Sequence, residues 1–429
     1  MQTPPHSDER LRQISRRKLI RMLAYTVDLV GIDDRYHGRR VGMIAAKLAQ
    51  RTIGFATPIS RVYDAGLLHD CGVSSTREHH NLLGEIEWSG AQRHCEIGHA
   101  LLQDFAPLAD FAPIIRYHHT RWPQLQDIGL DAGQALLANL IFLADRVDVA
   151  ATPYYADKSL FARRTSVLAQ MEAARDEVFA GILLDALHST AKNTDFWTDL
   201  CETQATEDFQ QAMLDHDVEQ SLTWPEFRQA AGILALIVDA KSPYTYQHSA
   251  GVARLSQYLA GLLGLNERRR ELIEVAGLLH DIGKLGIPDE ILESPLPLSE
   301  AQFTQMKRHS LTTHQILRRI GGIDEIADWA AYHHEKMNGQ GYPFHLDADH
   351  LPLEARIISV ADIFQALAQT RPYRGPTPPT EILATLCELA ESGHLDNHIV
   401  EMVAGHLDLC HVAAVGNTEA EHNPHKGCF

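Results

Sequence analysis

Cysteine and long hydrophobic runs are both scarce in this chain of 429 residues. Its six cysteines form no C-x-x-C pair, which argues against a zinc ribbon or a dithiol redox motif and fits a reducing cytoplasm. The longest apolar run, Ile233 to Val238, is far shorter than the roughly 20 residues that span a bilayer. The amino-terminal segment carries charges without a following apolar run, unlike a secretory signal. We therefore expect a cytoplasmic protein without a membrane partner.

Positive charge is also in short supply. Lys and Arg number 38 against 56 Asp and Glu, which gives a formal net charge of −18. Proteins that coat nucleic acids neutralise phosphates with Lys and Arg, so this balance argues against a nucleic acid polymer as a partner. An anionic small molecule would need a local basic pocket. Histidine, by contrast, is abundant at 25 residues, and its placement is informative.

The histidines reveal an internal repeat. The segment YDAGLLHDCG around His69 returns as EVAGLLHDIG around His280, an offset of 211 residues. Further pairs repeat at offsets from 211 to 217, namely His37 with His248, His94 with His309, His118 with His333, His119 with His334, and Asp145 with Asp362. We interpret this register as an ancestral duplication. It predicts a first domain over residues 1–221, a second over 222–415 and a disordered tail over 416–429.

Apolar residues around the repeated positions follow helical spacing. Val252, Leu255 and Leu259 are separated by steps of three and four residues, which places them on one face of a helix. Strand-like alternation is nearly absent, and clusters of proline and glycine such as RPYRGPTPP punctuate the helical segments. The predicted fold class is therefore all-α, with two helical domains in tandem.

The second copy of the repeat holds a set of residues suited to a metal cluster. It comprises five imidazoles and two carboxylates, which are His248, His280, Asp281, His309, His333, His334 and Asp362. Both ligand types suit first-row metals. The set is too large for one ordinary ion site, so we predict a two-metal centre in which Asp281 bridges ions about 3.5–4 Å apart. Any one of these histidines alone would more simply be a hydrogen-bonded or solvated helix residue.

Two motifs in this second copy resemble those of a known family. HDIGKLGIP at His280 to Pro288 and HHEKMNGQGYP at His333 to Pro343 resemble the HD-GYP domain, a branch of the HD phosphohydrolase superfamily. The resemblance implies hydrolysis of a cyclic dinucleotide, cyclic di-GMP or 3'3'-cyclic GMP-AMP, to the linear dinucleotide. It assigns the seven residues as ligands of two divalent ions, with iron favoured and manganese or another first-row metal as alternatives. Members with three ions carry a Glu where this chain has Tyr244, which favours a binuclear centre.

The resemblance also assigns residues to the reacting phosphate. Lys284 matches a lysine near the scissile phosphate, where it would act with Asp281 in catalysis by stabilising the charge that develops there. Arg371 and Arg374 follow in the order of the family's phosphate-binding residues, and arginine suits bidentate phosphate contacts. Without the resemblance, these would be an exposed lysine and a solvated pair of arginines.

The Gly-Tyr-Pro segment supplies two further assignments. Tyr342 resembles the family's signature tyrosine and would pack on a guanine base, although the tripeptide alone would indicate only a turn. Glu335 lies in the same motif, and we expect it to orient one of the ligand histidines. The predicted substrate contacts are thus Tyr342, Arg371 and Arg374.

The first copy keeps the ligand types but lacks the surrounding residues. Its candidate second metal site comprises His37, His69, Asp70, His94, His118, His119 and Asp145, and Asp33 precedes the first of these. Val73 takes the place of Lys284, no Gly-Tyr-Pro follows the paired histidines, and Tyr154 and Asp157 replace the two arginines. This copy resembles a plain HD domain, with metal binding left open and a packing or regulatory role favoured. The arrangement is similar to that of bacterial cyclic GMP-AMP phosphodiesterases.

Two other functions stay open at this point. Other HD branches hydrolyse deoxynucleoside triphosphates or alarmones, but the Gly-Tyr-Pro segment argues against that activity. A non-catalytic receptor for a cyclic dinucleotide is the second alternative, and the intact Lys284 and ligand set argue against it. A homodimer or a signalling protein partner also stays open.

Overall fold

The protein is helical throughout the part that the structure describes. This computed structural model describes residues 14–30, 36–52, 54–84, 90–215, 220–241, 247–369 and 375–416. Within these ranges no strand forms, and only isolated bridges join extended residues. The predicted all-α class is confirmed. The domain limits at residues 221 and 415 stay predictions, and the expected tail lies outside the described residues except for Gly416.

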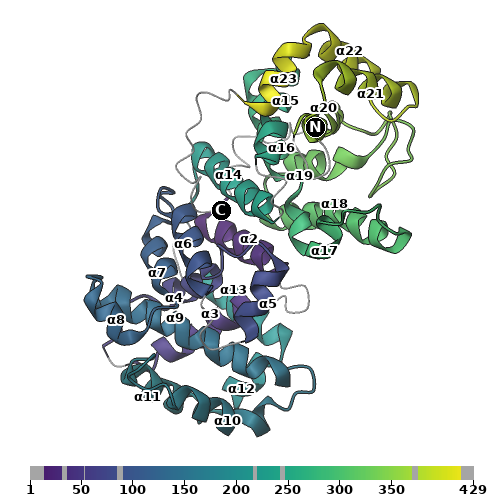
Figure 1. Ribbon diagram of the computed structural model, residues 1–429. Helices are drawn as coiled ribbons and strands as arrows, with labels where there is room; N and C mark the ends of the chain where they lie inside the picture. Colours follow the sequence, from purple (N-terminus) through teal and green to yellow (C-terminus); the bar gives the residue numbers. More distant parts are fainter. Residues whose placement is uncertain are drawn as a thin grey trace, which may run out of the picture.

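The helices form two lobes that meet at a narrower waist (Figure 1). The first lobe contains α2 (Arg16–Asp28), α3 (His37–Ala49), α4 (Ile59–Leu68), α5 (Thr76–Gly84), α6 (Ala91–Leu102), η1 (Ala109–Phe111), α7 (Ala112–Tyr117), α8 (Trp122–Asp127), α9 (Ala132–Ala151), η2 (Thr152–Tyr154), α10 (Leu160–Glu172), α11 (Gly181–Thr190), α12 (Thr194–Leu200) and α13 (Thr203–Asp215). The segments that begin and end the described part of this lobe pair with each other, since the Arg16 N–H donates to the Gln220 carbonyl at 2.8 Å.

The second lobe runs from teal to yellow in Figure 1. It contains α14 (Trp224–Ala240), α15 (His248–Leu262), α16 (Glu267–Leu279), η3 (Ile282–Gly286), α17 (Asp289–Leu292), α18 (Glu300–Ile320), α19 (Asp324–Ala331), η4 (Tyr332–His334), α20 (Leu353–Ala368), α21 (Pro379–Glu391), α22 (Asn397–Gly405) and α23 (Leu407–Val415). The elements labelled η are short 3₁₀ helices. One of them, η4, carries His333 and His334 of the predicted metal set, and η3 begins directly after Asp281.

Local capping explains where the principal helices of the second lobe begin. Thr223 accepts the N–H of Glu226, whose carboxylate returns to the Thr223 backbone, so α14 starts on a capping box. Ser299 and Gln302 form the same arrangement at the start of α18. Each box satisfies backbone donors that a helix cannot pair internally, which fixes the entry point of the two helices that face the first lobe.

The same three-helix core recurs in both lobes. In the first lobe α3 packs on α4 and α9, and in the second α15 packs on α16 and α20. A Cβ atom at Gly66 would lie 2.5 Å from the Gly42 Cα, and one at the matching Gly277 would lie 2.9 Å from the Ala253 Cα. Only small residues allow helices to approach this closely. The structure thus repeats the backbone arrangement that the sequence repeat predicted.

No single helix in the described ranges has the length and apolar character to cross a membrane. Helices α22 and α23 meet those criteria only when taken together, on length and composition alone, and a bend of 94° separates them. Both contribute buried residues, including Val403 and Cys410, to the hydrophobic core.

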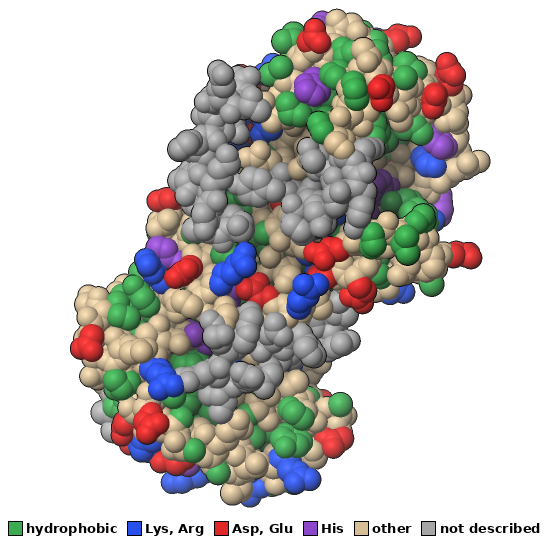
Figure 2. Space-filling view, viewed as in Figure 1, with side chains coloured by type: hydrophobic (Ala, Val, Ile, Leu, Met, Phe, Trp, Pro, Cys, Tyr) green, Lys and Arg blue, Asp and Glu red, His purple; other side chains and the backbone are tan. Residues whose placement is uncertain are grey.

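A buried ion pair of the second lobe contacts the first lobe at the waist. Asp289, at the start of α17, accepts the Lys241 ammonium at 3.1 Å and the backbone N–H groups of Thr76 and Arg77 at 3.2 and 3.1 Å. The second lobe therefore caps the amino terminus of α5 in the first lobe. The Lys241 side chain is 1% exposed and that of Asp289 is 9% exposed. Figure 2 shows charged side chains of both signs where the lobes meet.

We expect Asp289→Asn to lower the free energy of unfolding by about 3 kcal/mol, because it leaves the buried Lys241 ammonium without a counter-charge. Chemical denaturation followed by circular dichroism would measure the change. The adjacent Glu290→Gln removes one charge from an exposed position and should stay within about 0.5 kcal/mol of the wild type. Equal destabilisation by both substitutions would contradict this assignment.

Candidate metal centre

The second lobe brings together all seven residues of the predicted metal set. His248 begins α15, His280 and Asp281 lie between α16 and η3, His309 lies on α18, His333 and His334 lie in η4, and Asp362 lies on α20. Three overlapping groups have ligand atoms within 4.8 Å of one another, and all but His334 are buried. Residues more than 100 positions apart in the sequence thus converge on one interior point.

Glycine allows two of these elements to meet. A Cβ atom at Gly283 would lie 2.1 Å from the carbonyl oxygen of His309, so a larger residue would push α18 away from the His280–Asp281 turn. Thr313 on α18 fixes the contact, since its hydroxyl accepts the Gly283 N–H at 3.0 Å and donates to the His280 carbonyl at 3.0 Å. The approach of α18 to η3 therefore sets the position of His309.

The imidazole rings are oriented by their outer nitrogens. Nδ1 of His280, His309 and His333 each donate to a backbone carbonyl one turn earlier, at 2.8, 2.7 and 2.6 Å. His248 Nδ1 donates instead to the side-chain oxygen of Gln365. Because a carbonyl can only accept, the proton resides on Nδ1, and Nε2 presents its lone pair to the centre. Sequence reasoning missed Gln365, which lies three residues after Asp362.

The central atoms fit a divalent cation. His248 Nε2 lies 3.2 Å from Asp362 Oδ1, and His280 Nε2 lies 3.1 Å from Asp281 Oδ2. Within the described residues, His280 Nε2 and Asp281 Oδ1 are buried and have no hydrogen-bond donor. Such an unsatisfied atom costs about 1–3 kcal/mol, whereas a cation would complete it. Imidazole and carboxylate donors together suit first-row metals.

The protonation states also favour a cation. Burial, reinforced by the neighbouring His334, lowers the pKa of His309 to about 3, and burial lowers the pKa of His334 to about 4. Burial alone would raise the pKa of Asp281, but His280 and Lys284 hold it well below its usual range. At neutral pH these two imidazoles are therefore neutral and the carboxylate is ionised, as metal ligands require.

Lys284 and Tyr342 lie beside this centre. The Lys284 ammonium is 2.5 Å from Asp281 Oδ2, and its side chain remains 24% exposed, so it faces both the centre and solvent. The Tyr342 ring lies 4.9 Å from the ring of His334, and the Lys307 ammonium lies 5.5 Å from the Tyr342 ring centroid. Lys307 is a cation that sequence reasoning missed, because it stands outside both family motifs. The predicted contacts Arg371 and Arg374 lie outside the described residues, as do Tyr244 and Asp33.

Glu335 has a different role from the one expected. Its carboxylate accepts the backbone N–H groups of Phe344, His345 and Leu346 at 2.6, 3.1 and 3.0 Å, and the residue is 1% exposed. These bonds close the segment that carries Tyr342, and no ligand histidine of the described chain is hydrogen-bonded to Glu335. The expectation that Glu335 orients a ligand was wrong because three amide donors use its oxygens.

We expect Glu335→Gln to raise the KM for the cyclic dinucleotide that the resemblance implies and to lower the free energy of unfolding by about 1–3 kcal/mol. The Gln amide has one accepting oxygen in place of two. Its NH₂ group is itself a donor and would face the loop N–H groups without forming a hydrogen bond. Steady-state kinetics and denaturation would measure both effects. Glu325→Gln, which alters an exposed side chain on α19, is the control. An unchanged KM in both variants would contradict the role of Glu335 in holding the loop.

The first lobe assembles its own set in the same way. His37 Nε2 lies 3.4 Å from Asp145 Oδ1, while His69 and His94 approach the two oxygens of Asp70 at 3.3 Å each. His118 Nε2 lies 4.0 Å from Asp70, and His119 Nε2 lies 3.8 Å from Asp145. All seven residues predicted for this lobe therefore surround one interior point, as in the second lobe.

An internal cation distinguishes the centre of the first lobe. Arg146 donates to Asp145 Oδ2 through Nε at 3.1 Å and Nη2 at 2.7 Å, and it is 3% exposed. The repeat places Ile363 at the matching position of the second lobe. One oxygen of Asp145 thus already has a permanent positive partner, which reduces its capacity to bind metal. The sequence held the signal, an arginine directly after Asp145, but nothing in it showed which way the side chain would turn.

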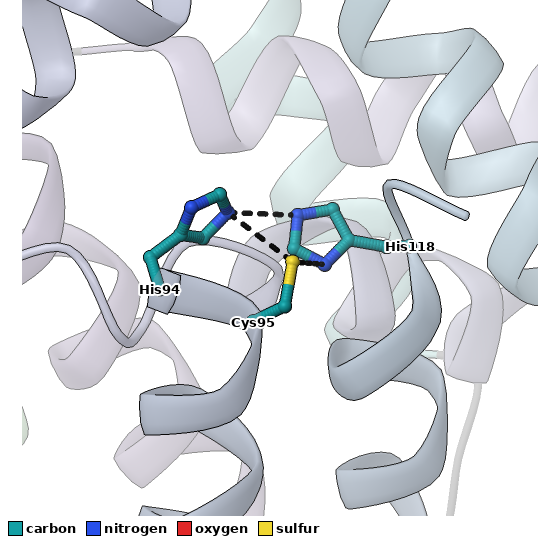
Figure 3. Close-up of side chains that lie close together, drawn as sticks. All are labelled: His94, Cys95 and His118. Carbon is teal, nitrogen blue, oxygen red and sulfur yellow. Dashed lines mark hydrogen bonds between the residues drawn. The ribbon is translucent and has the colours of Figure 1, made fainter. Parts of the chain in front are cut away.

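Cys95 adds a sulfur to this centre. Figure 3 shows its side chain between the rings of His94 and His118, with the sulfur 3.7 Å from His94 Nε2 and 3.5 Å from His118 Nδ1. The repeat places Ser310 at the matching position. Burial and the nearby Asp70 raise the pKa of the Cys95 thiol well above its usual value, so the group is a neutral thiol that packs against the rings.

Comparison with known proteins identifies both lobes. Residues 35–150 and residues 232–399 each match a family described as HD domain. HD domains bind divalent metals, in agreement with the two His and Asp clusters. The tandem arrangement that the sequence repeat predicted is therefore confirmed.

One curated relative and one solved structure match most of the chain, and a second relative matches about half of it. A 3'3'-cGAMP-specific phosphodiesterase of Vibrio cholerae is 35% identical over 390 residues, covering 89% of this chain and 89% of that protein. A cyclic di-GMP phosphodiesterase of Pseudomonas aeruginosa is 30% identical over 208 residues, covering 48% of this chain and 49% of that protein. The solved structure of a cyclic GMP-AMP-specific phosphodiesterase of V. cholerae shares the fold, with a TM-score of 0.61 at 24% identity over 92% of this chain and 98% of that one.

Proposed function

This chain belongs to the family of tandem HD-domain phosphodiesterases, and on that premise we propose that its second lobe hydrolyses a 3'3'-cyclic dinucleotide to the linear dinucleotide. The observation that carries the proposal is the convergence of seven ligand-type residues with Lys284 and Tyr342 at one point of the second lobe. The hydrolysis adds water to phosphorus and breaks one phosphodiester bond, so the ring opens without any oxidant or second substrate.

The metal ligands proposed are His248, His280, Asp281, His309, His333, His334 and Asp362. These residues would hold two divalent ions, which would supply Lewis-acid activation of water and phosphate. We favour iron as the metal, with manganese as the alternative. The orphaned lone pairs of His280 and Asp281 support this assignment. Asp281 is the best candidate to bridge, since His248, His280, His309 and His333 all approach its two oxygens within 4.0 Å.

Lys284 is the proposed stabiliser of charge on the reacting phosphate. Its ammonium already pairs with Asp281, so a phosphate held at this centre would lie within reach of the same donor. Hydrogen bonds to an oxygen that gains charge in the transition state lower the barrier more than they strengthen ground-state binding. Tyr342 offers an aromatic face for a base, and Arg371 and Arg374 are proposed to hold the second phosphate.

The substrate we favour is 3'3'-cyclic GMP-AMP. The V. cholerae relative that covers 89% of this chain is named as specific for this dinucleotide. The cyclic di-GMP phosphodiesterase of P. aeruginosa covers only 48% of this chain. The first lobe is proposed to be non-catalytic for two reasons. Val73 takes the position that Lys284 has in the second lobe, and the Arg146 guanidinium is hydrogen-bonded to the Asp145 carboxylate.

Parallel assays would test the proposal. Metal-loaded protein is incubated under anaerobic conditions with 3'3'-cyclic GMP-AMP, cyclic di-GMP, a deoxynucleoside triphosphate and an alarmone, and the products are separated by chromatography. We expect linear dinucleotide from 3'3'-cyclic GMP-AMP at the highest kcat/KM. Tight binding of a cyclic dinucleotide without any product would favour the receptor alternative, and hydrolysis of only the triphosphate or alarmone would overturn the proposal.

A further inference from the structure

A pocket lies between the lobes, away from both metal-type centres. Its cavity volume is about 60 Å³, it opens to solvent, and residues of α2, α3, α13 and α18 line it. The contributing side chains include Arg21 and Tyr25 of α2, Arg39 of α3, Gln210 of α13 and Arg319 of α18. Helices α2 and α18 are in direct contact at this junction, as Figure 1 shows for the waist of the molecule. The pocket shares no residue with either centre.

Three guanidinium groups converge on this pocket. Within the described part of the chain, Arg21 and Arg319 form no ion pair, and Arg39 has only the half-exposed Glu207 at 3.6 Å. The Arg39 side chain is 9% exposed and that of Glu207 is 48% exposed, so the carboxylate that faces Arg39 is itself partly solvated. Burial, followed by the adjacent charges of Arg39 and Arg319, lowers the pKa of Arg21 despite the opposing effect of Glu207, as expected where like charges lie close together. The cluster is unusual in a chain whose net charge is −18.

Tyr25 orders the cluster across the junction. The Arg319 guanidinium carbon lies 4.3 Å from the centroid of the Tyr25 ring, and that of Arg39 lies 5.9 Å from it. Arginines from both lobes thus contact one aromatic ring, a contact that favours cations through the ring's negative face. A guanidinium group that packs its face on an aromatic ring keeps its N–H edges available for an acceptor.

Gln210 supplies a second, independent indication of a ligand. It lines the pocket, is 4% exposed and belongs to none of the side-chain hydrogen bonds formed by the described residues. Neither of its amide atoms is sealed from solvent without a partner, so within the described residues the amide faces the open pocket, where a ligand or water can pair with it. Its NH₂ group could donate to the same acceptor as the arginines.

We propose that this junction pocket binds a phosphate-bearing anion, either free phosphate or a phosphate monoester such as a nucleoside 5'-monophosphate. A phosphate monoester carries about −1.5 to −2 charges at neutral pH and three strong acceptor oxygens, which match several converging guanidinium groups better than a carboxylate does. The bound anion would join α2 and α3 of the first lobe to α18, the helix that also carries His309. The proposal does not depend on which reaction the second lobe catalyses.

Calorimetric titration of the full-length protein tests this site. One arm uses inorganic phosphate and the other uses AMP, both at constant ionic strength with chloride as the balancing anion. The variants are Arg21→Gln and Arg319→Gln, and Arg51→Gln is the charge-matched control at an exposed position beyond the end of α3. We expect affinity to fall about tenfold or more in the first two variants and to be retained in the control.

The outcomes separate the junction site from the metal centres. A binding event that is lost in both pocket variants supports the site, and tighter binding of AMP than of phosphate identifies a monoester as its ligand. Isotherms of both pocket variants that superimpose on the wild type would overturn the proposal, as would an equal loss in Arg51→Gln. Because Arg319 is exposed, its variant tests the site even where Arg21→Gln fails to fold. Gln210→Leu, which keeps all charges, should weaken binding by a smaller factor.

Discussion

Asp281→Asn is expected to lower kcat by about 10³-fold or more, while the matching Asp70→Asn leaves kcat unchanged. The substitution keeps the size of the side chain but removes the charge that several imidazoles surround. The orphaned Oδ1 atom would become part of a neutral amide, so the centre would lose both its proposed bridging ligand and its capacity to hold two cations. Metal content should fall together with turnover.

The repeat supplies an internal control for this experiment. Asp70 and Asp281 occupy equivalent turns and have similar histidine neighbours, so general effects of losing a buried carboxylate should be alike. Elemental analysis and steady-state kinetics of both variants would separate the two lobes. A loss of turnover in Asp70→Asn equal to that in Asp281→Asn would place catalysis in both lobes and contradict the account.

Lys284→Gln is expected to lower kcat by about 10²–10³-fold with metal content retained. The Lys284 ammonium is positively charged and cannot bind a metal cation, so its loss should leave the metal in place. It contacts Asp281 and is partly exposed to solvent on the side from which a phosphate would enter. Since its charge would act mainly on the transition state, KM should change much less than kcat.

Lys284→Arg is the conservative variant for this test, because it keeps the charge but changes the donor geometry, and it should retain part of the activity. Lys192→Gln, at an exposed position of the first lobe, is the neutral control. Metal loss in Lys284→Gln equal to that in Asp281→Asn would indicate a structural role, and an unchanged kcat would exclude Lys284 from the reaction.

Polar residues predicted this fold better than hydrophobic periodicity did. The spacing of apolar residues indicates helices but does not indicate which helices pack together. The repeated His and Asp positions predict that the helices carrying them pack together in the same way in both lobes, and α3, α4 and α9 do pack as α15, α16 and α20 do. Gly283 and Gly66 then explain how closely the helices approach. The all-α class followed from the helical spacing of apolar residues and the near absence of strand-like alternation, and the gathering of each ligand set followed from the register of the repeat.

Contacts between distant segments without a repeated pattern were not predictable. Asp289 caps α5 across the waist, more than 200 residues away, and no periodicity links it to Thr76. Arg146 could have faced solvent, and only the packed interior of the first lobe turns it onto Asp145. Glu335 was predicted to orient a histidine, but the path of the chain through Phe344 placed three amide donors around it. Such partners depend on tertiary structure, which short motifs do not encode.

Removal and return of metal would test the central claim most directly. The wild-type protein is treated with a chelator, desalted and reloaded anaerobically with ferrous or manganous ions, and hydrolysis of 3'3'-cyclic GMP-AMP and metal content are measured at each stage. The account predicts that turnover disappears with the metal and returns as the second lobe refills, while Asp281→Asn recovers neither. Full hydrolysis by the metal-free protein would contradict it.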